Sequence, residues 1–563
     1  MKNHKFRRLF SALLAAALLV GAAGCSGGNE TGSGGGSQAG GGEEDSNFNE
    51  SGWPVVNEKV TLKVYGSRDS NAPEDWNDYI LFQDMEKTTN VHFEWELIEG
   101  STYQERKSVM INSGNLPDII KDGMSVLEVA RYGQEGLLLE LGEMQEKYCP
   151  QLMHFYEINS VMKAAATMPD GKIYSFPYWG GAPWFGIYRM GVINTDWLEA
   201  VDMEMPTSLS ELKEVLIAFR DEDPNGNGEK DEIPLSWNGG LYSTEGQWHF
   251  GLNFLGDAFR APSNPDLLDV VDGKVVFVPT REEYKDYVKW MHELYAEGLL
   301  DDTGFSQSPD QYKAKLCAET PVVGVASVWE IGDDFADYSY YDHYEYLDPL
   351  KGLNGEDPLP YYTPYPTIGA DKWVVTNACQ MPEVAVRVAD YFYDEELSLE
   401  FAEGLFGEEA SQETQVRQVP CTVCNNGEAY MVADPPEGVN TQVFRHHCSP
   451  ASNIPFYYSL ETTKRLQHLH YTDKKAKKLE YIATIYDTER IGVLNYTTEE
   501  SEIVSQVQAD IIAYADRRAA EWVMNGKIDE EWDAYLEELK NMNLDGYLEA
   551  VQNAQDRFEE IAG

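Results

Sequence analysis

The ten residues from Asp223 to Glu232 carry the side chains best suited to binding a metal ion. Gly228, at position 6 of this segment, permits a sharp turn, and Glu229 at position 7 would contribute its main-chain carbonyl. Calcium prefers about six to eight oxygen ligands from carboxylates, amides and carbonyls. The segment therefore predicts a calcium site. Its oxygen-bearing side chains, at positions 1, 3, 5, 9 and 10, are Asp223, Asn225, Asn227, Asp231 and Glu232.

A metal-free interpretation of this segment stays open. Calcium loops of twelve residues usually end in a bidentate glutamate, but position 12 here is Pro234, so Asp231 and Glu232 would have to close the site. Asn-Gly and Asp-Pro pairs also form ordinary solvated turns. The number of correctly spaced oxygens favours calcium over an acidic turn.

A second group of residues has the chemistry of carbohydrate binding. The chain has 13 tryptophans and 34 tyrosines, and flat rings stack on the C–H faces of sugars. Tryptophan is also highly buried on average, so each single ring has a core interpretation as well. Charged side chains in loops after strands would bind hydroxyl groups. The candidate ligand-binding residues are Trp329, Trp184, Trp179, Phe185, Arg68, Asp69, Trp237 and Trp248.

The charge of such a ligand is left open by the sequence. Gly123 and Met124 follow another expected strand end and add to the candidate region. A uronate sugar would need cationic partners such as Arg68, Arg189 or Arg260. In so acidic a chain a neutral oligosaccharide is at least as well supported.

The N-terminus has the pattern of an export signal. Four basic residues precede the apolar run 9–20, which is too short to span a membrane. The run is followed by Ala22-Ala23-Gly24-Cys25, which resembles the lipobox of bacterial lipoproteins, where the cysteine is lipidated. An ordinary cleavage site with an incidental cysteine is the alternative. The glycine- and serine-rich stretch 26–47 predicts a flexible tether.

Composition excludes one class of partner and bounds the architecture. The chain has 96 acidic and 43 basic residues, and its net charge is −53 at pH 7. Such a chain repels nucleic acid, which we exclude as a partner. Roughly 510 residues beyond the tether predict two domains or lobes.

The cysteines allow three interpretations. Cys421 and Cys424 have zinc-ligand spacing, and His446, His447 and Cys448 follow, but adjacent residues point apart and seldom share one metal. A disulfide within this group, or free buried thiols, is favoured in an exported protein.

Strands and helices alternate in the first third of the chain. Period-two hydrophobicity predicts strands at 59–64 and 91–97, with a helix at 76–87 between them. A second helix at 103–113 leads to a strand at 117–120. This order favours parallel strands in an open α/β sheet, whose ligands bind beyond the carboxyl ends of the strands.

The later elements continue this pattern and end in helices. Ser208 to Glu211 has the pattern of a capping box that opens a helix reaching about 220. The stretch 338–365 is expected to be irregular, and Gly526 to end a long helix that begins near 499. Other expected elements are strands at 322–329 and 372–376 and helices at 282–297, 382–393, 530–541 and 544–558.

Several short motifs together resemble the family-1 extracellular solute-binding proteins, the lipoprotein receptors of bacterial ABC sugar importers. Each motif is weak alone, and their order along nearly the whole mature chain is specific. The motifs are Ser113–Ile120, Gly136–Leu141, Asp170–Pro177, Tyr295–Asp301 and the segment that starts at Trp532.

This resemblance implies an α/β fold of the two-lobe, periplasmic-binding-protein-like type II, with a central cleft and C-terminal helices. We expect a signal peptide at 1–24 and a tether at 25–50. The first lobe would contain 51–180 with about 350–405, and the second lobe 181–349 with about 406–563.

Within the family, the chain is most similar to the large alginate-oligosaccharide-binding members, which carry a structural calcium loop. The resemblance then implies a non-catalytic, monomeric receptor that delivers an oligosaccharide to ABC permease subunits and is anchored outside the cell membrane through Cys25. The alternatives are a secreted, calcium-stabilised glycoside hydrolase or lyase, and a peptide-binding or signalling receptor on the same scaffold. The implied calcium ligands are Asp223, Asn225, Asn227, Glu229, Asp231 and Glu232.

Overall fold

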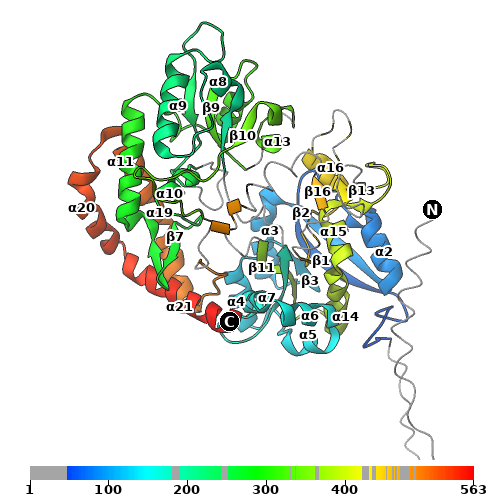
Figure 1. Cartoon of the computed structure of the whole chain (residues 1–563). Helices are drawn as coiled ribbons and strands as arrows, with labels where there is room; N and C mark the ends of the chain where they lie inside the picture. The colour runs from blue at the N-terminus through cyan, green and yellow to red at the C-terminus, as the bar shows by residue number, and fades with distance from the viewer. Residues whose placement is uncertain are drawn as a thin grey trace, which may run out of the picture. The chain divides into compact units, whose positions relative to one another are not determined.

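The structure is a computed structural model of the 563-residue chain (Figure 1). The predicted signal peptide, Cys25 and most of the predicted tether lie outside the residues that it describes. The described residues are 47–180, 190–242, 251–329, 331–335, 338–361, 367–420, 430–433, 441–451, 453–459, 466–468 and 490–563, with isolated positions between 436 and 485.

The first core is built around a six-stranded sheet in the order β15-β4-β11-β3-β1-β2. Strands β1 (Val60–Arg68) and β2 (Val91–Glu99) pair in parallel, and β1 also pairs in parallel with β3 (Ile119–Lys121). The parallel β-α-β order predicted from the sequence is therefore confirmed. The crossing helices are α2 (Ile80–Thr89) and α3 (Gly100–Ser113), and the other strands are β4 (Ser175–Gly180), β11 (Thr367–Val375) and β15 (Tyr457–Tyr458).

Apolar faces of short helices cover this sheet. The ring of Phe82 on α2 lies 5.0 Å from that of Trp95 on β2 and 5.2 Å from that of Phe401, so one aromatic cluster joins distant parts of the chain. The other helices of the first core are α4 (Val126–Gln134), α5 (Gly142–Tyr148), α6 (Pro150–Ile158), α7 (Ser160–Ala166), α14 (Pro382–Ala389) and α15 (Glu395–Glu403).

The second core surrounds a four-stranded sheet in the order β10-β5-β9-β6. Its strands are β5 (Met190–Asn194), β6 (Ile233–Ser236), β9 (Val323–Val328) and β10 (Tyr344–Tyr346). Its helices are α8 (Thr195–Ala200), α9 (Leu209–Asp221), α10 (Asn253–Ala258), α11 (Glu282–Ala296), α12 (Pro309–Leu316) and α13 (Ile331–Asp334), and the hairpin strands β7 (Leu268–Val271) and β8 (Lys274–Phe277) pack with them.

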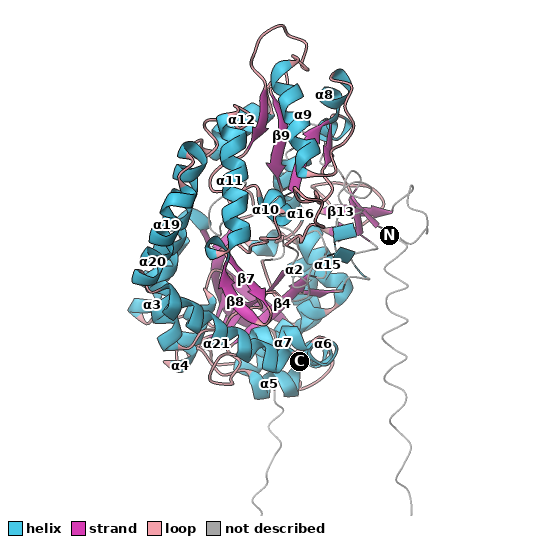
Figure 2. Ribbon diagram, turned by 60° about the vertical axis from the view of Figure 1, so that its left-hand side comes forward, coloured by secondary structure: helices cyan, strands magenta, loops and turns pink. Residues whose placement is uncertain are grey.

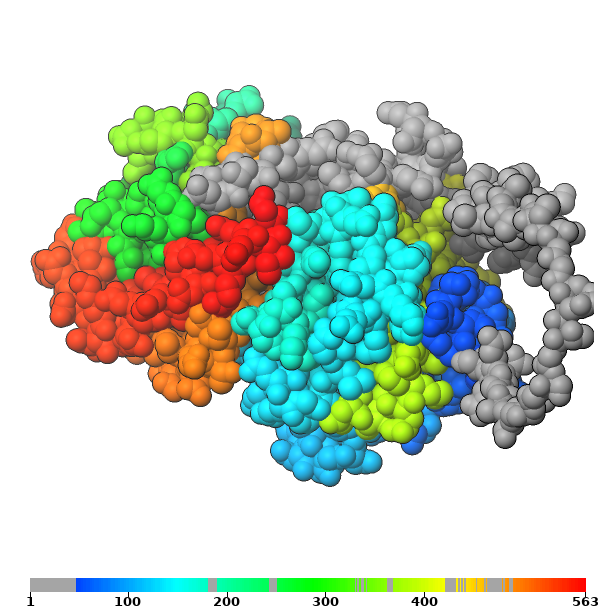
Figure 3. Space-filling model, turned by 90° about the horizontal axis from the view of Figure 1, so that it is seen from below, coloured from blue at the N-terminus to red at the C-terminus, as the bar shows by residue number. Residues whose placement is uncertain are grey.

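Three C-terminal helices follow, as the sequence predicted: α19 (Thr498–Asn525), α20 (Ile528–Asn541) and α21 (Leu544–Ala562). The Thr497 side chain and Glu500 form a capping box at the start of α19, and Gly526 ends it at φ +71°, a conformation that favours glycine. Helix α19 packs on α11 (Figure 2), and α21, in red, packs on the cyan segment that contains α7 (Figure 3). The C-terminal helices therefore contact both cores.

One lobe boundary differs from the expectation, because a small sheet and helix α16 (Thr441–Cys448) follow α15. The strands of this sheet are β12 (Leu405–Phe406), β13 (Val416–Pro420), β14 (Tyr430–Val432) and β16 (Leu466–His468). Gln415 Oε1 accepts a hydrogen bond from Ile80 N at 2.8 Å, and β15 joins the first sheet. The described residues between 406 and 458 therefore pack with the first core, whereas the sequence assigned them to the second lobe.

Two further expectations differ in detail from the structure. The stretch 338–365 contains a 3-10 helix at 338–342 and strand β10, which pairs with β5. Ser208 Oγ accepts from Glu211 N, but the Glu211 carboxylate accepts from Thr207 N and Oγ1, so the capping box is only half formed. Within the described residues, none of the helices is both long and apolar enough to cross a membrane.

Candidate functional site

The predicted metal loop connects α9 to β6 and curls tightly. Asp223, Gly226 and Gly228 have φ values of +48°, +68° and +79°. Gly228 N donates to Asp223 Oδ2 at 3.0 Å, and Asn227 N donates to Asn225 Oδ1 at 3.0 Å. The loop therefore folds around the side-chain oxygens of its first and third positions.

Two carboxylate oxygens in this loop are buried without a donor. Asp223 Oδ1 and Glu232 Oε1 are closed to solvent and accept no hydrogen bond from an amide, hydroxyl or ammonium group of the described residues. The pKa of Glu232 is raised, chiefly by burial, and also by the negative charges of Asp231 and Asp223 and by a side-chain hydrogen bond with Asp223. Buried carboxylate oxygens are costly unless they are paired, so this donor set fits a cation.

The side-chain amides of the loop donate hydrogen bonds to the carboxylate of Asp231. Asn227 Nδ2 lies 3.1 Å from both oxygens of Asp231, and Asn225 Nδ2 donates to Asp231 Oδ1 at 3.0 Å. Among the described residues, no group of three or more His, Cys, Asp and Glu side chains is arranged to hold a metal ion. A cation here would therefore need amide and carbonyl oxygens as well, which calcium accepts.

A second cluster lies at the carboxyl edge of the six-stranded sheet, which we call the edge cluster. Strand β1 ends near Ser67 and β3 ends near Lys121 and Asp122. Strand β11 runs antiparallel to β3 and brings Asp371 and Lys372 to the same edge, where its pairing with β4 is bulged between Gly369 and Trp373. The cluster comprises Ser67, Arg68, Asp69, Lys121, Asp122, Asp371 and Lys372.

Asp122 is the centre of the edge cluster. Its Oδ1 accepts from Lys372 Nζ at 2.7 Å, and its Oδ2 accepts from Ser67 Oγ at 2.8 Å. Burial alone would raise the pKa of Asp122, but the charges of Lys372 and Lys121 outweigh it and hold this pKa well below its usual range. Asp122 is therefore an ionised carboxylate whose two oxygens are both occupied.

Burial shifts the pKa values of Lys121 and Asp371 toward the uncharged form of each side chain. Lys121 is fully buried, its Nζ lies 4.0 Å from the centre of the Trp76 ring, and burial lowers its pKa to about 7. Burial raises the pKa of Asp371 to about 6, and its Oδ1 has no partner among the described residues. Perturbed groups at a sheet edge of this kind are typical of ligand sites.

The predicted pair Arg68 and Asp69 lies at this edge, as expected. Arg68 Nη1 donates to the main-chain oxygens of Asp69 and Ala72, each at 3.2 Å. Asp69 Oδ1 accepts from Asn71 N at 2.8 Å. Of the two neighbouring candidates, the Gly123 carbonyl accepts from Lys107 Nζ at 2.7 Å, while Met124 is buried.

The predicted aromatic candidates divide between surface and core. Trp179 on β4 and Trp329, directly after β9, are both part-buried. Trp237 is fully buried: its indole N–H donates to Gly239 O at 3.1 Å, and its ring lies edge-on to Phe305 at 5.0 Å. Trp237 is therefore a core residue in this structure and not a surface for sugar stacking. Trp184, Phe185, Arg189 and Trp248 lie outside the described residues.

Arg260 and Cys448 are the remaining candidates that the structure describes outside the edge cluster. Arg260 Nη1 donates to Asp357 O at 3.2 Å, within the second core's surface. Cys448 is a buried free thiol, and the pKa of that thiol is raised by burial to about 12. Cys421 and Cys424 lie outside the described residues, so the disulfide and zinc interpretations stay predictions.

Sequence reasoning missed Lys121, Asp122, Asp371 and Lys372. Lys121 and Asp122 directly follow the strand residues Ile119 and Ile120, the same signal that pointed to Arg68 and Asp69. Asp371 and Lys372 carry no such signal, because an antiparallel strand reaches this edge with its amino end.

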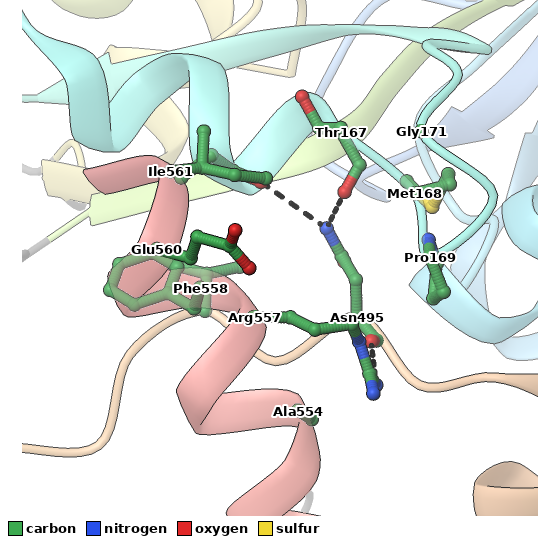
Figure 4. A pocket seen from close by; sticks show the side chains of 12 residues that line it. Thr167, Met168, Pro169, Gly171, Asn495, Ala554, Arg557, Phe558, Glu560 and Ile561 are labelled. Atoms are coloured by element: carbon green, nitrogen blue, oxygen red, sulfur yellow. Dashed lines mark hydrogen bonds between the residues drawn. The ribbon is translucent and has the colours of Figure 1, made fainter. Parts of the chain in front are cut away.

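The structure also contains a pocket of about 160 Å³ between α7 and α21 (Figure 4). Asn495 Nδ2 points at the end of α7 and donates to Ala165 O at 3.0 Å and Thr167 O at 2.7 Å. The rest of the pocket lining is largely apolar and includes Met168, Phe558 and Ile561. We assign this region to the packing of the C-terminal helix on the first core.

These features together define an α/β binding protein, and comparison with known proteins identifies its family. The model of the bacterial extracellular solute-binding proteins matches residues 67–397, and the chain belongs to that family. It is 30% identical over 517 residues to FusA, a fructooligosaccharide ABC transporter substrate-binding protein of Streptococcus pneumoniae serotype 4, covering 90% of this chain and 91% of FusA.

Solved structures share the fold. FusA in complex with kestose is 28% identical, with a TM-score of 0.73 over 89% of this chain and 100% of that chain. A FusA EF-hand mutant in complex with fructo-nystose is also 28% identical, with a TM-score of 0.72 over 89% of this chain and 100% of that chain. The alginate-binding protein AlgQ2, at 20% identity and a TM-score of 0.64 over 89% and 99%, supports the fold alone. The predicted two-lobe α/β architecture is confirmed.

Proposed function

We propose that this chain captures a fructooligosaccharide outside the cell and delivers it to the permease subunits of an ABC transporter. The observation that carries the proposal is the match to FusA, which extends over 90% of this chain and is accompanied by the same fold in a kestose complex. The edge cluster supports a polyhydroxylated ligand, because it places carboxylates, a hydroxyl and ammonium groups at the carboxyl ends of β1 and β3.

Calorimetry on the mature protein tests this proposal. Kestose and nystose are titrated, with malto-oligosaccharides and short peptides as comparison ligands. We expect saturable one-to-one binding of the fructans at micromolar or lower Kd and weaker or no binding of the others. Tight peptide binding without a response to any sugar would contradict the proposal and support the peptide-receptor alternative.

The same samples test the absence of catalysis that we propose. A glycoside hydrolase or lyase would release shorter sugars from the titrated fructan during long incubation. We expect chromatography to recover kestose and nystose intact. Release of fructose at a rate above that of protein-free buffer would support the enzyme alternative.

We also infer that the loop Asp223–Glu232 binds calcium as a structural ion. The unpartnered oxygens of Asp223 and Glu232 support this inference, as does the raised pKa of Glu232. The FusA neighbour, whose structure was solved as an EF-hand mutant, supports it independently. Bound calcium would supply positive charge to the carboxylates of Asp223, Asp231 and Glu232 and so hold the turn between α9 and β6.

We propose further that Cys25 is lipidated and anchors a monomeric receptor to the outer face of the cell membrane. The export signal, the Ala-Ala-Gly-Cys sequence and the glycine-rich stretch that follows support this arrangement. The high negative charge is consistent with a lipid anchor, because an acidic surface would not bind anionic headgroups by itself.

A further inference from the structure

Most donors of the edge-cluster cations are engaged within the protein, and Arg68 Nε is buried without a partner among the described residues. Lys372 Nζ donates to Asp122, and both Arg68 contacts given above go to main-chain oxygens. Arg68 Nη2 also lies 3.8 Å from Glu74 Oε1. Lys121 is buried beneath the Trp76 ring, and its Nζ lies 3.5 Å from Asn453 O.

The carboxylates of the edge cluster differ in how many hydrogen-bond donors they have. The two oxygens of Asp122 are occupied by Lys372 and Ser67, but Asp371 Oδ1 is buried and has no donor among the described residues. Buried polar atoms are nearly always hydrogen-bonded in folded proteins, so a partner supplied from outside the protein would explain this atom. The bulge in β11 at this point is typical of strands that turn a side chain toward a site.

We propose that Asp371 accepts a hydrogen bond from a ligand hydroxyl, and that its charge makes the edge cluster select neutral oligosaccharides over uronate oligosaccharides. This inference rests on the proposed function and adds to it the residue that sets the charge class of the ligand. A sugar hydroxyl donates to a carboxylate, whereas a uronate carboxylate beside Asp371 would be repelled by its like charge.

The ionisation of Asp371 at neutral pH is consistent with this role. Burial raises its pKa to about 6, while the positive charge of Lys372 opposes that rise. Hydrogen bonds to a charged group are roughly twice as strong as bonds between neutral groups. Loss of this bond should therefore weaken binding of a neutral ligand by a factor on the order of ten or more.

The experiment measures the affinities of nystose and of a galacturonate tetrasaccharide for the mature wild-type protein and three variants. Asp371→Ala removes the acceptor, and Asp371→Asn keeps an oxygen acceptor of the same shape without the charge. Asp118→Asn is the matched control, since Asp118 precedes β3 at the opposite end of the strand, where its carboxylate accepts from Lys63 N at 2.8 Å.

We expect the wild type and Asp118→Asn to bind nystose and not the galacturonate. Asp371→Ala should lose at least about tenfold in nystose affinity. Asp371→Asn should lose less, and its discrimination against galacturonate should narrow. Thermal unfolding of each variant checks that it is folded, and Asp371→Asn carries the test if Asp371→Ala is not.

The outcomes separate this inference from the proposed function. If both Asp371 variants bind nystose as tightly as the wild type, Asp371 does not contact the ligand and the inference is overturned while the receptor function stands. Galacturonate binding by the wild type that equals nystose binding would also overturn the selectivity. If the wild type binds neither sugar, the proposed function itself fails.

Discussion

At the scale of the residue, Asp223 and Asp371 share a property that supports the roles proposed for them. Each has a buried oxygen without a donor, whereas the carboxylate of Asp122 has a partner on both oxygens. An unpartnered buried oxygen costs about 1–3 kcal/mol, and a partner from outside the chain would offset that cost. For Asp223 we infer a calcium ion, and for Asp371 a sugar hydroxyl.

Replacement of Asp223 by Ala should abolish stabilisation by calcium. With free calcium about 100-fold above its Kd, binding stabilises the folded state by about 2.7 kcal/mol. Differential scanning calorimetry with and without chelator should show a lower Tm for the chelated wild type and no difference for Asp223→Ala. Glu229→Ala is the matched control, because the exposed Glu229 would bind only through its main-chain oxygen and should keep the calcium response. A wild-type Tm that is indifferent to chelator contradicts a structural metal.

Asp257 gives the second core a pH dependence. It is buried, its Oδ1 accepts from Tyr361 N at 3.1 Å, and burial raises its pKa to about 8. The folded state therefore retains a proton that the unfolded chain, with an ordinary aspartate pKa of about 4, has lost. The stability contributed by this proton is full below about pH 4 and is lost as the pH rises toward 8.

Asp257→Asn should remove that dependence while it keeps the oxygen that accepts from Tyr361. Its free energy of unfolding should exceed that of the wild type by an amount that grows from pH 4 to pH 8, by up to about 1.4 kcal/mol for each pH unit. Urea denaturation at several pH values measures the difference. A difference that is constant across this range would show that Asp257 does not titrate as its burial implies.

At the scale of elements, the C-terminal segment stabilises the end of a helix that is remote in sequence. At the carboxyl end of α7, Thr167 N donates to Lys163 O and Ala164 O, and Asn495 Nδ2 donates to Ala165 O and Thr167 O. Arg557 on α21 in turn donates to Asn495 O at 3.1 Å and pairs with Glu500. Asn495 therefore links the end of α7 to α21.

Asn495→Ala should destabilise the protein by about 1–3 kcal/mol, because buried carbonyls lose their donors. The free energy of unfolding from urea titration measures this loss. Asn541→Ala is the matched control, since Asn541 is exposed on α20 and bonds only to Glu538, and it should change stability by less than about 0.5 kcal/mol. Equal effects of the two substitutions would contradict a special role for Asn495.

Local patterns predicted the parallel strands and the terminal helices, because the signals lie within one segment. The alternation of Val60, Leu62 and Val64 defines β1, and Gly526 ends α19. The antiparallel insertion of β11 and the return of the described residues between 406 and 458 to the first core depend on pairings between distant segments, which no local pattern encodes. For the same reason the sequence did not predict the position of Asp371 or the burial of Trp237. The candidate calcium loop could be predicted because its oxygen-bearing residues are neighbours in sequence.

At the scale of the whole molecule, charge and anchoring act together. A net charge of −53 repels other copies of the chain and an anionic bilayer, which is consistent with the covalent lipid anchor that we propose. Both cores belong to one unit, residues 47–563, and the membrane attachment that we propose lies outside it. Ligand binding should therefore survive release from the membrane.

Cys25→Ser should move the protein from the membrane fraction to the soluble fraction of the expressing cells while kestose affinity stays unchanged. The reason is that lipidation needs the thiol, and no described helix could span the bilayer. Fractionation followed by immunoblotting measures the distribution, with Cys149→Ser as a control for loss of a buried thiol. Persistence of Cys25→Ser in the membrane fraction would refute the anchor.

The burial of most described tryptophans has an optical consequence. Trp76, Trp197, Trp237, Trp373 and Trp522 are at most 2% exposed, so solvent relaxation should hardly change their emission. Trp179 on β4 and Trp329 after β9 are part-buried. Trp179 packs against the hydrophobic cluster of the first core, and Trp329 packs against a different cluster. Intrinsic fluorescence would therefore consist of a large constant blue-shifted signal and a small variable one. Replacing Trp179 or Trp329 by Phe would therefore show, without a label, how much of a ligand-induced change in emission each ring contributes.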